Sequence, residues 1–384
     1  MDQSLPRSSG PVCGRAADRE WRYPLPLMCT PFEPGTLDDV LAAMPDDDFG
    51  TIAHAEACYY RGQPEEAARL AAPYLTSDDI SLRISACMLC AYASLSLGKS
   101  FVARTALKSL AAMRSCPEVS QDPRARASYG LFAASACVLL HLPPPISPVE
   151  FMETAPLLPE GLRLFASYAL AHHIYLAGDH GRCVGMVENA LFMKQDTYPI
   201  PELFLHLMAS IGWINLRDKP KAEDHFGRAW ALARPDDLIE EFGEHQALLQ
   251  GMVESCIKRE NPVDYARIIA VARRFSQGWH GVHNPKAGAA VAANLTPTEF
   301  VISMLACRGW TNDEIARHIG VSRGTVKNRL SNAYAKLGVK NRAALKQHML
   351  QSGRASPADA PERMAHAGGG LPAAAVTTTG EKCA

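Results

Sequence analysis

Apolar residues between Leu37 and Phe275 recur with a helical period along almost the whole stretch. The stretch contains no convincing run in which β-branched residues alternate with polar ones, which is the usual mark of a strand. Each helix is expected to bury its apolar stripe against neighbouring helices rather than against a sheet. The pattern therefore predicts an all-α fold for this region.

A fixed spacing repeats within the helical region. A turn residue ends one helix, and five positions later a small residue opens the buried face of the next helix. The pairs with this spacing are Gly62 and Ala67, Gly98 and Ala103, Gly178 and Cys183, Arg217 and Ala222, and Asn261 and Ala266. Successive turn residues lie 36, 80, 39 and 44 positions apart, and the interval of 80 equals about two units. Helix pairs that repeat at such a period are typical of an α-solenoid.

The missing unit falls near residues 139–148, where LPPPISP interrupts the helical pattern. In the fourth clear unit, Ala222, Phe226 and Ala229 lie at i, i+4 and i+7, and Pro235 follows the helix. This spacing resembles the second helix of a tetratricopeptide repeat, although the usual Trp and Tyr positions are poorly filled. We expect tetratricopeptide-like hairpins, and a plain helical bundle is the alternative that the pattern leaves open.

Three segments lack these patterns. Residues 1–36 are rich in proline and glycine, and we expect a disordered N-terminal arm. Residues 276–293 combine Gly, Pro and small residues, which predicts a linker. Residues 352–384 are a low-complexity sequence that is expected to form a disordered tail. The expected folded parts are a helical sensor or interaction domain at 37–275 and a second domain at 294–351.

Residues 294–351 carry the signals of four short helices. The expected N-caps are the polar residues before each helix, namely Thr296, Thr311, Ser322 and Asn341. Glu299 and Glu314 stand where capping boxes require a carboxylate. Gly320 and Gly338 are expected to end the second and third helices, because glycine adopts a left-handed backbone at little cost. Two short helices joined by Gly-Val-Ser predict a helix-turn-helix.

The third of these helices has one apolar and one polar face. The expected buried stripe follows the i, i+4, i+7 and i+11 positions Val326, Leu330, Ala333 and Leu337. Asn328 and Ser331 lie nearly opposite that stripe, and Lys327 flanks them. Such a helix fits the major groove of DNA, whose width admits one helix and whose base edges offer donors and acceptors.

Charge is divided unevenly between the two folded parts. Residues 294–350 hold nine Lys/Arg and three Asp/Glu, a net charge of +6, whereas residues 1–293 hold 27 and 34, a net charge of −7. A small basic domain after a larger acidic region favours a polyanion as partner of the C-terminal domain alone. A merely solvated polar face is the competing interpretation, but it does not account for the caps, the glycine stops and the charge together.

The C-terminal sequence resembles the LuxR-type, GerE-like DNA-binding domain through LTPTEFVISMLACRGWTNDEIARHIGVSRGTVKNRLSNAYAKLGVKNRAA. The resemblance covers about 57 residues without gaps. It implies four helices, a third helix that enters the major groove, a fourth that often pairs two copies, and a role in bacterial transcription regulation. Leu345 and Met349 would give the fourth helix a modest apolar surface for a homodimer on DNA.

By matched position, the resemblance implies that Lys327, Asn328 and Ser331 face the groove, with Asn328 suited to an adenine. The candidates for phosphate contacts, which orient the protein without reading sequence, are Ser322, Arg323, Thr325, Arg329 and Lys336. Arg342 matches an Asn-Arg pair of the family, and both a DNA contact and a structural role inside the domain stay open for it.

Signals for other chemistry are weak. The chain has no GxxxxGK[ST] phosphate loop and no serine in a nucleophile elbow. His172 with His173 and His280 with His283 lack a matched ligand set, and the CxxC of Cys87 and Cys90 lies in an apolar helix without a second CxxC. We expect no enzyme activity, no cofactor and no metal.

The expected cellular setting follows from what the chain lacks. No signal peptide and no apolar run of membrane length is visible, which predicts a cytoplasmic protein with reduced thiols and no membrane partner. The expected partners are double-stranded DNA and a protein or small-molecule effector at the helical domain. Two alternatives remain open: a helical-repeat scaffold with a vestigial DNA module, and a sigma-factor-like partner of RNA polymerase.

Overall fold

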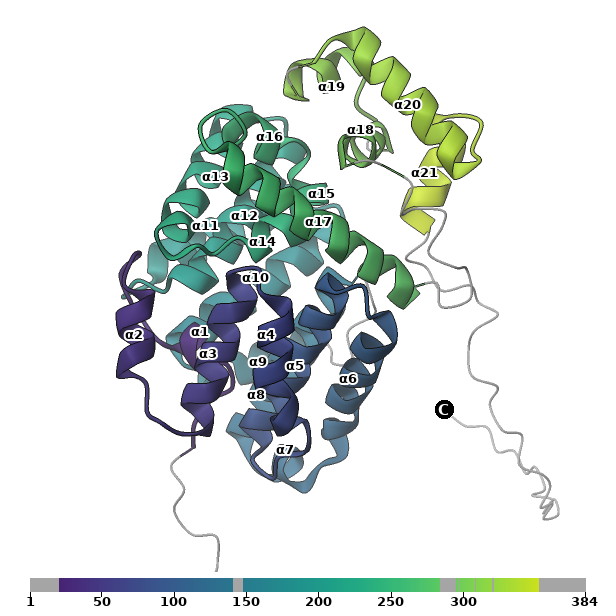
Figure 1. The fold of residues 1–384 in the computed structure, drawn as a ribbon. Coiled ribbons are helices and arrows are strands. Elements are labelled where there is room, and N and C mark those ends of the chain that lie inside the picture. Colours follow the sequence, from purple (N-terminus) through teal and green to yellow (C-terminus); the bar gives the residue numbers. More distant parts are fainter. Residues whose placement is uncertain are drawn as a thin grey trace, which may run out of the picture. The chain divides into compact units, whose positions relative to one another are not determined.

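The computed structural model describes residues 21–140, 148–283, 295, 297–307, 309–319 and 321–351. Every regular element in these ranges is an α-helix or a short 3-10 helix, and none is a strand (Figure 1). This composition confirms the all-α prediction. None of the described helices is long and apolar enough to cross a membrane.

The first helices, before the undescribed residues 141–147, have the following bounds. They are α1 (Pro26–Cys29), α2 (Leu37–Ala43), α3 (Asp48–Tyr60), α4 (Pro64–Ala71), α5 (Ile80–Ser96), α6 (Ser100–Ala112), α7 (Pro117–Gln121) and α8 (Pro123–Leu139). The next are α9 (Pro148–Thr154), α10 (Glu160–Leu176), α11 (His180–Met193), α12 (Pro199–Asn215), α13 (Lys219–Ala233), α14 (Glu240–Glu244), α15 (Gln246–Leu249), α16 (Met252–Cys256) and α17 (Pro262–His283). The C-terminal helices are α18 (Pro297–Cys307), α19 (Asn312–Ile319), α20 (Arg323–Leu337) and α21 (Arg342–Gln351).

Four helix pairs are joined by the same tight turn, and in each pair the two helices pack on one another: α3 with α4, α5 with α6, α10 with α11, and α12 with α13. The turn residues all have positive φ, namely Gly62 (73°), Gly98 (69°), Gly178 (88°) and Arg217 (64°). The next amide then donates to a carbonyl five residues back, as from Lys99 to Ser94 at 2.8 Å and from Asp218 to Trp213 at 3.0 Å. This bond closes the helix end in a Schellman motif.

The small residue five positions after each of these turns is fully buried: Ala67, Ala103, Cys183 and Ala222. The prediction is wrong for the fifth pair, because Ala266 is exposed and Asn261 does not have positive φ. The helix that follows Asn261 is α17, and it buries Ile268, Val271 and Phe275 instead. The buried face of α17 is therefore set by these three apolar residues and not by Ala266.

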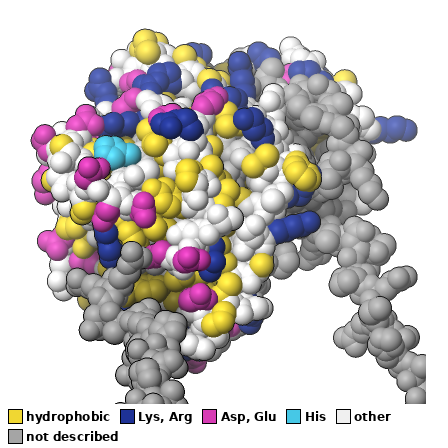
Figure 2. Space-filling model, turned by 60° about the horizontal axis from the view of Figure 1, so that its bottom comes forward, with side chains coloured by type: hydrophobic (Ala, Val, Ile, Leu, Met, Phe, Trp, Pro, Cys, Tyr) yellow, Lys and Arg dark blue, Asp and Glu magenta, His cyan; other side chains and the backbone are white. Residues whose placement is uncertain are grey.

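Helices α3, α5, α8, α10 and α12 form a row in which each contacts the next, and all but α8 are first helices of the four pairs. Helix α8 packs between α5 and α10 and also contacts α9, so α8 and α9 take the place of the unit missing from the sequence spacing. Each helix in this row contributes a mostly apolar stripe, and the buried residues form one continuous core. The exposed face drawn in Figure 2 carries both signs of charge among scattered apolar side chains.

Helices α14 and α17 lie across this row. Helix α14 packs against α3 and α17, and α17 also packs against α5 and α6. The prediction of a linker from residue 276 is wrong for residues 276–283, which continue α17. Gly278 explains the misreading, because a Cβ there would lie 2.1 Å from the carbonyl oxygen of Leu95. The glycine serves close helix packing and not a chain break; residues 284–293 lie outside the described part.

The prediction of a disordered arm is wrong for residues 21–36, which we call the N-terminal segment. Leu25, Leu27, Met28 and Phe32 of this segment are buried, with Leu27 at 0% and Met28 at 1% exposure. Helix α1 within this segment contacts α3, α10 and α12. The sequence favours a mobile arm by its prolines, but proline is also compatible with an extended chain held by outside partners. Residues 1–20 and the predicted tail 352–384 lie outside the described residues.

Candidate nucleic-acid interface

Helices α18 to α21 form the C-terminal domain around a small apolar core. Helix α18 packs against α20 and α21, and α19 packs against α20. The stripe predicted on α20 is confirmed, since the exposures of Val326, Leu330, Ala333 and Leu337 are 0%, 4%, 0% and 5%. Burial of this stripe fixes the rotation of α20 about its own axis and so determines which of its residues face outward.

Hydrogen bonds at the helix ends hold the turn between α19 and α20. Thr311 and Glu314 form a reciprocal capping box: the Thr311 amide donates to the Glu314 carboxylate at 2.7 Å, and the Glu314 amide donates to the Thr311 hydroxyl at 3.3 Å. The hydrogen bonds from Thr311 hold the pKa of Glu314 below its ordinary value. Ser322 caps α20 by accepting from the Thr325 amide at 3.0 Å. Gly338 ends α20 with φ 66°, as predicted, whereas Thr296 and Gly320 lie outside the described residues.

Six of the predicted site residues are exposed on α20 or at its N-cap: Ser322, Arg323, Lys327, Asn328, Ser331 and Lys336. Arg323 is largely exposed, and its guanidinium lies 3.5 Å from the carboxylate of Asp313. Lys327, Asn328 and Ser331 form the polar surface opposite the buried stripe. An ammonium, an amide and a hydroxyl on one exposed helix face offer the donors and acceptors that base edges and phosphates require.

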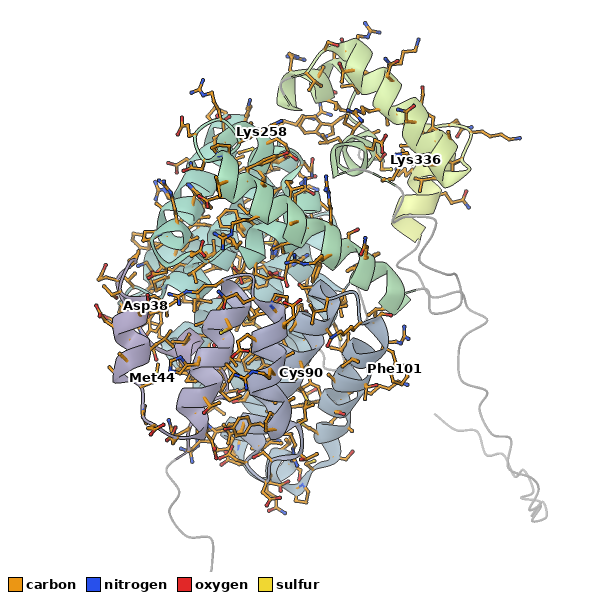
Figure 3. All side chains as sticks on the ribbon, viewed as in Figure 1. Asp38, Met44, Cys90, Phe101, Lys258 and Lys336 are labelled. Carbon is orange, nitrogen blue, oxygen red and sulfur yellow. The ribbon has the colours of Figure 1, made fainter. Side chains whose placement is uncertain are left out.

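Lys336 and the three half-buried predicted residues, Thr325, Arg329 and Arg342, make contacts within the domain. Thr325 is half-buried, and its hydroxyl lies 2.9 Å from that of Ser322 within the helix cap. The ammonium of Lys336, which Figure 3 labels in the C-terminal domain, donates to the carboxylate of Glu299 at 2.7 Å. Arg329 is also half-buried, and its guanidinium lies 4.0 Å from Glu299. Lys336 and Arg329 are seven residues apart, so both point toward α18 from the same side of α20.

Arg342 acts inside the domain. Its guanidinium donates to the carbonyl oxygen of Trp310 at 2.5 Å and to the side-chain oxygen of Asn312 at 2.6 Å. These two contacts tie the start of α21 to the start of α19, the first helix of the helix-turn-helix. Of the two roles that the sequence leaves open for Arg342, these contacts favour the structural one.

The predicted set misses two residues of this domain. Glu299 is expected from the sequence only as a cap partner, yet its side chain is 2% exposed and holds Lys336. The sequence signal that could have identified Glu299 is the seven-residue spacing of Arg329 and Lys336 on α20. This spacing places both cations on one side of the helix, where a carboxylate on the facing helix can pair with them. Arg317 is exposed on α19, two positions after the buried Ile315. Since the first helix of such a motif crosses the DNA backbone, Arg317 is a candidate for a phosphate contact.

One of the two residues expected to pair two copies through α21 is buried. Leu345 is 0% exposed and belongs to the apolar core, and α21 packs on α18. The Met349 side chain lies outside the described residues. The expectation that Leu345 contributes to a dimer surface is therefore wrong.

The Cys and His motifs of the helical region are part of its packing. Cys87 and Cys90 are buried in α5, where desolvation raises their pKa values to about 12 and about 11, and Figure 3 shows Cys90 among the packed helices. His172 is buried with its ring 3.2 Å from the hydroxyl of Tyr168. Among the residues that the structure describes, no group of His, Cys, Asp and Glu has the arrangement of a metal site.

Comparisons with known proteins converge on the same domain. Residues 293–349 match the family described as bacterial regulatory proteins, luxR family. The probable transcriptional regulatory protein SgaR of Hyphomicrobium methylovorum is 50% identical over 50 residues, which are 13% of this chain and 24% of that protein. The chain thus covers about a quarter of the relative's length. No solved structure matches the chain. Residues 293–349 are therefore a helix-turn-helix domain of the luxR family.

Proposed function

We propose that the chain is a bacterial transcription regulator that binds double-stranded DNA by placing α20 in the major groove. The observation that carries this proposal is the exposed polar face of α20, with Lys327, Asn328 and Ser331 opposite a fully packed apolar stripe. The match to the luxR family and the regulatory name of the SgaR relative support it. A net charge of +6 on residues 294–350 supplies the attraction to phosphate.

The residues of the interface have different roles in this proposal. Lys327 and Asn328 read base edges, and Ser331 supports them by hydrogen bonding. Ser322, Arg323 and Arg317 contact phosphates, and Arg329 adds charge at the edge of the interface. Thr325, Lys336 and Arg342 hold the domain together. The helical domain at 37–275 receives a protein, peptide or small-molecule signal, and two chains bind one operator through a surface other than Leu345.

The test uses the full chain and a pool of duplexes with random sequence. Repeated selection is expected to enrich one sequence, and affinity for it should fall steeply as salt concentration rises. Lys327→Ala is expected to weaken binding to the enriched duplex by about 10- to 100-fold and to relax the selected sequence. Arg323→Ala is expected to weaken binding to all duplexes alike. It should also reduce the magnitude of the slope of log affinity against log salt concentration by about one.

The matched control is Lys258→Ala, which removes an exposed lysine from the helical region and should leave DNA affinity unchanged (Figure 3). Failure to enrich any sequence, or affinity that does not respond to salt, contradicts the proposal. Equal losses of DNA affinity for Lys327→Ala and Lys258→Ala would contradict the proposal that α20 lies in the major groove.

A further inference from the structure

The N-terminal segment is held by main-chain hydrogen bonds to side chains that lie far away in the sequence. The amides of Leu27 and Met28, at the start of α1, donate to the two carboxylate oxygens of Glu56 at 2.8 and 3.3 Å. The Leu25 amide donates to the hydroxyl of Ser85 at 3.0 Å. Glu56 is itself fully buried. These contacts depend on backbone amides and are the kind that a groove makes with a peptide.

The surface that holds the segment is formed by several helices, and we call it the inner groove. It is defined by Glu56 of α3, Ser85 of α5, Gly161 of α10 and the carbonyl of Thr197, which accepts from the Phe32 amide at 3.0 Å. A Cβ at Gly161 would lie 2.1 Å from the carbonyl oxygen of Met28. Gly161 therefore gives the groove room for a peptide backbone.

Two features distinguish this segment from an ordinary core element. Among the described residues it is joined to the other helices only at its C-terminal end, before α2, so its displacement requires no threading past another described helix. Leu25 is held at φ 52° and ψ 73°, a left-handed conformation that costs a leucine about 1 kcal/mol. The bound conformation is thus partly strained.

Displacement of the segment removes both amide donors from the carboxyl group of Glu56. A replacement occupant must supply two adjacent amides at the first turn of a helix. It must also bury apolar side chains in place of Leu25, Leu27, Met28 and Phe32, which are between 0% and 7% exposed.

We propose that the inner groove is a peptide-binding site, occupied in this structure by the chain's own residues 21–36, and that its partner is a protein segment of the same chemistry. That segment is mostly apolar, begins a one-turn helix with a proline, carries a cation in the place of Arg22 opposite Asp47, and binds by displacing residues 21–36. The inference deepens the proposed effector control of the helical domain. It is tested by peptide binding without DNA, so its failure is distinguishable from failure of the DNA-binding proposal.

The probe is a labelled synthetic peptide with the sequence of residues 21–36, added to the full chain. In the wild-type chain the tethered segment competes at an effective concentration of about millimolar, so the peptide should bind poorly. Leu27→Asp in the full chain places a second carboxyl group beside Glu56 and releases the tethered segment. The peptide is then expected to bind on the order of 100-fold more tightly than to the wild-type chain.

Groove variants then locate the binding site. In the Leu27→Asp background, Gly161→Ala should abolish peptide binding, because its methyl group occupies the place of the Met28 carbonyl. Gly185→Ala, on α11 with open space around it, is the matched control and should retain binding. A peptide that itself carries Leu27→Asp should not bind. Absence of binding to a folded Leu27→Asp chain overturns the proposal, as does equal binding to the Gly161 and Gly185 variants.

Hydrogen exchange of the wild-type chain decides the case if Leu27→Asp does not fold. A displaceable segment predicts that the amides of Leu27 and Met28 exchange at least tenfold faster than the central amides of α10 and α12. Equal exchange rates at these positions would make the segment an inseparable part of the core and would overturn the proposal.

Discussion

Lys327 and Lys336 lie on the same helix, α20, in different surroundings. Lys327 is exposed on the polar face, whereas the ammonium of Lys336 bonds a carboxylate that is 2% exposed. Surface ion pairs contribute little to stability, but a pair with one buried member contributes more, because removing one charge leaves the other in a poorly solvated place. At the scale of single residues, recognition and stability are therefore assigned to different cations.

Lys336→Met is expected to lower the local stability of the C-terminal domain by about 1–3 kcal/mol, since it removes a charge-assisted hydrogen bond to Glu299. Faster hydrogen exchange in α18 and α20 would report this change. Lys340→Met removes an exposed cation just after α20 and should leave exchange unchanged. Equal effects of the two substitutions would show that the pair with Glu299 does not stabilise the domain.

Buried carboxyl groups are a second feature at this scale. Desolvation raises the pKa of Glu56 to about 8 and that of Glu240 to about 7. Glu241 and Glu244 are also buried, and burial raises their pKa values well above the ordinary range. At these carboxyl groups the folded state therefore binds more protons than the unfolded chain. The stability that these groups contribute is complete below about pH 4.5 and is lost as pH rises through their folded pKa values.

Glu240→Gln keeps an oxygen that can accept from the Ser96 hydroxyl but removes the titration. The free energy of unfolding of the wild-type chain, minus that of this variant, is expected to fall by on the order of 2 kcal/mol between pH 5 and pH 7.5. The buried histidines contribute equally to the pH dependence of the wild-type chain and of the variant, so their contributions cancel in this difference. Denaturant titrations at each pH measure it. Glu118→Gln, an exposed glutamate on α7, is the control; a flat difference for Glu240→Gln contradicts the assigned burial.

At the scale of elements, the helix pairs owe their shape to single turn residues with positive φ. The sequence spacing identified all four of these positions, including the non-glycine Arg217. The same reasoning failed where glycine has another use: Gly161 and Gly278 permit close backbone approach and do not end a helix. The local sequence identifies a glycine, but only the residues packed against it show whether the glycine forms a turn or allows close packing.

Gly178 and Gly185 isolate the effect of positive φ experimentally. Both have open space where a Cβ would lie, but Gly178 has φ 88° and Gly185 lies inside α11. Gly178→Ala is therefore expected to destabilise the helical region by about 1–2 kcal/mol through backbone strain alone. Gly185→Ala should stabilise it by about 0.5–1 kcal/mol. Thermal unfolding of the two variants measures the contrast, and shifts of the same sign would contradict it.

At the scale of the whole molecule, prediction succeeded where a pattern is local. The helix-turn-helix follows from caps and a stripe within about 40 residues, and the all-α class follows from periodicity. Prediction failed for the N-terminal segment, because the partners that order it, such as Glu56 and Thr197, are remote in sequence. The polar face of α20 was likewise predicted, whereas the place of Glu299 between Lys336 and Arg329 required the packing of two helices.

The remote anchoring of the N-terminal segment also has a consequence for synthesis. Phe32 leaves the ribosome early, but Thr197, whose carbonyl receives its amide, is translated 165 residues later. At a translation rate of roughly 5–20 residues per second, this apolar segment of the nascent chain stays without its partners for about 10–30 s. Chaperones that recognise short apolar stretches have that interval in which to engage it, and slow codons before α12 would lengthen it.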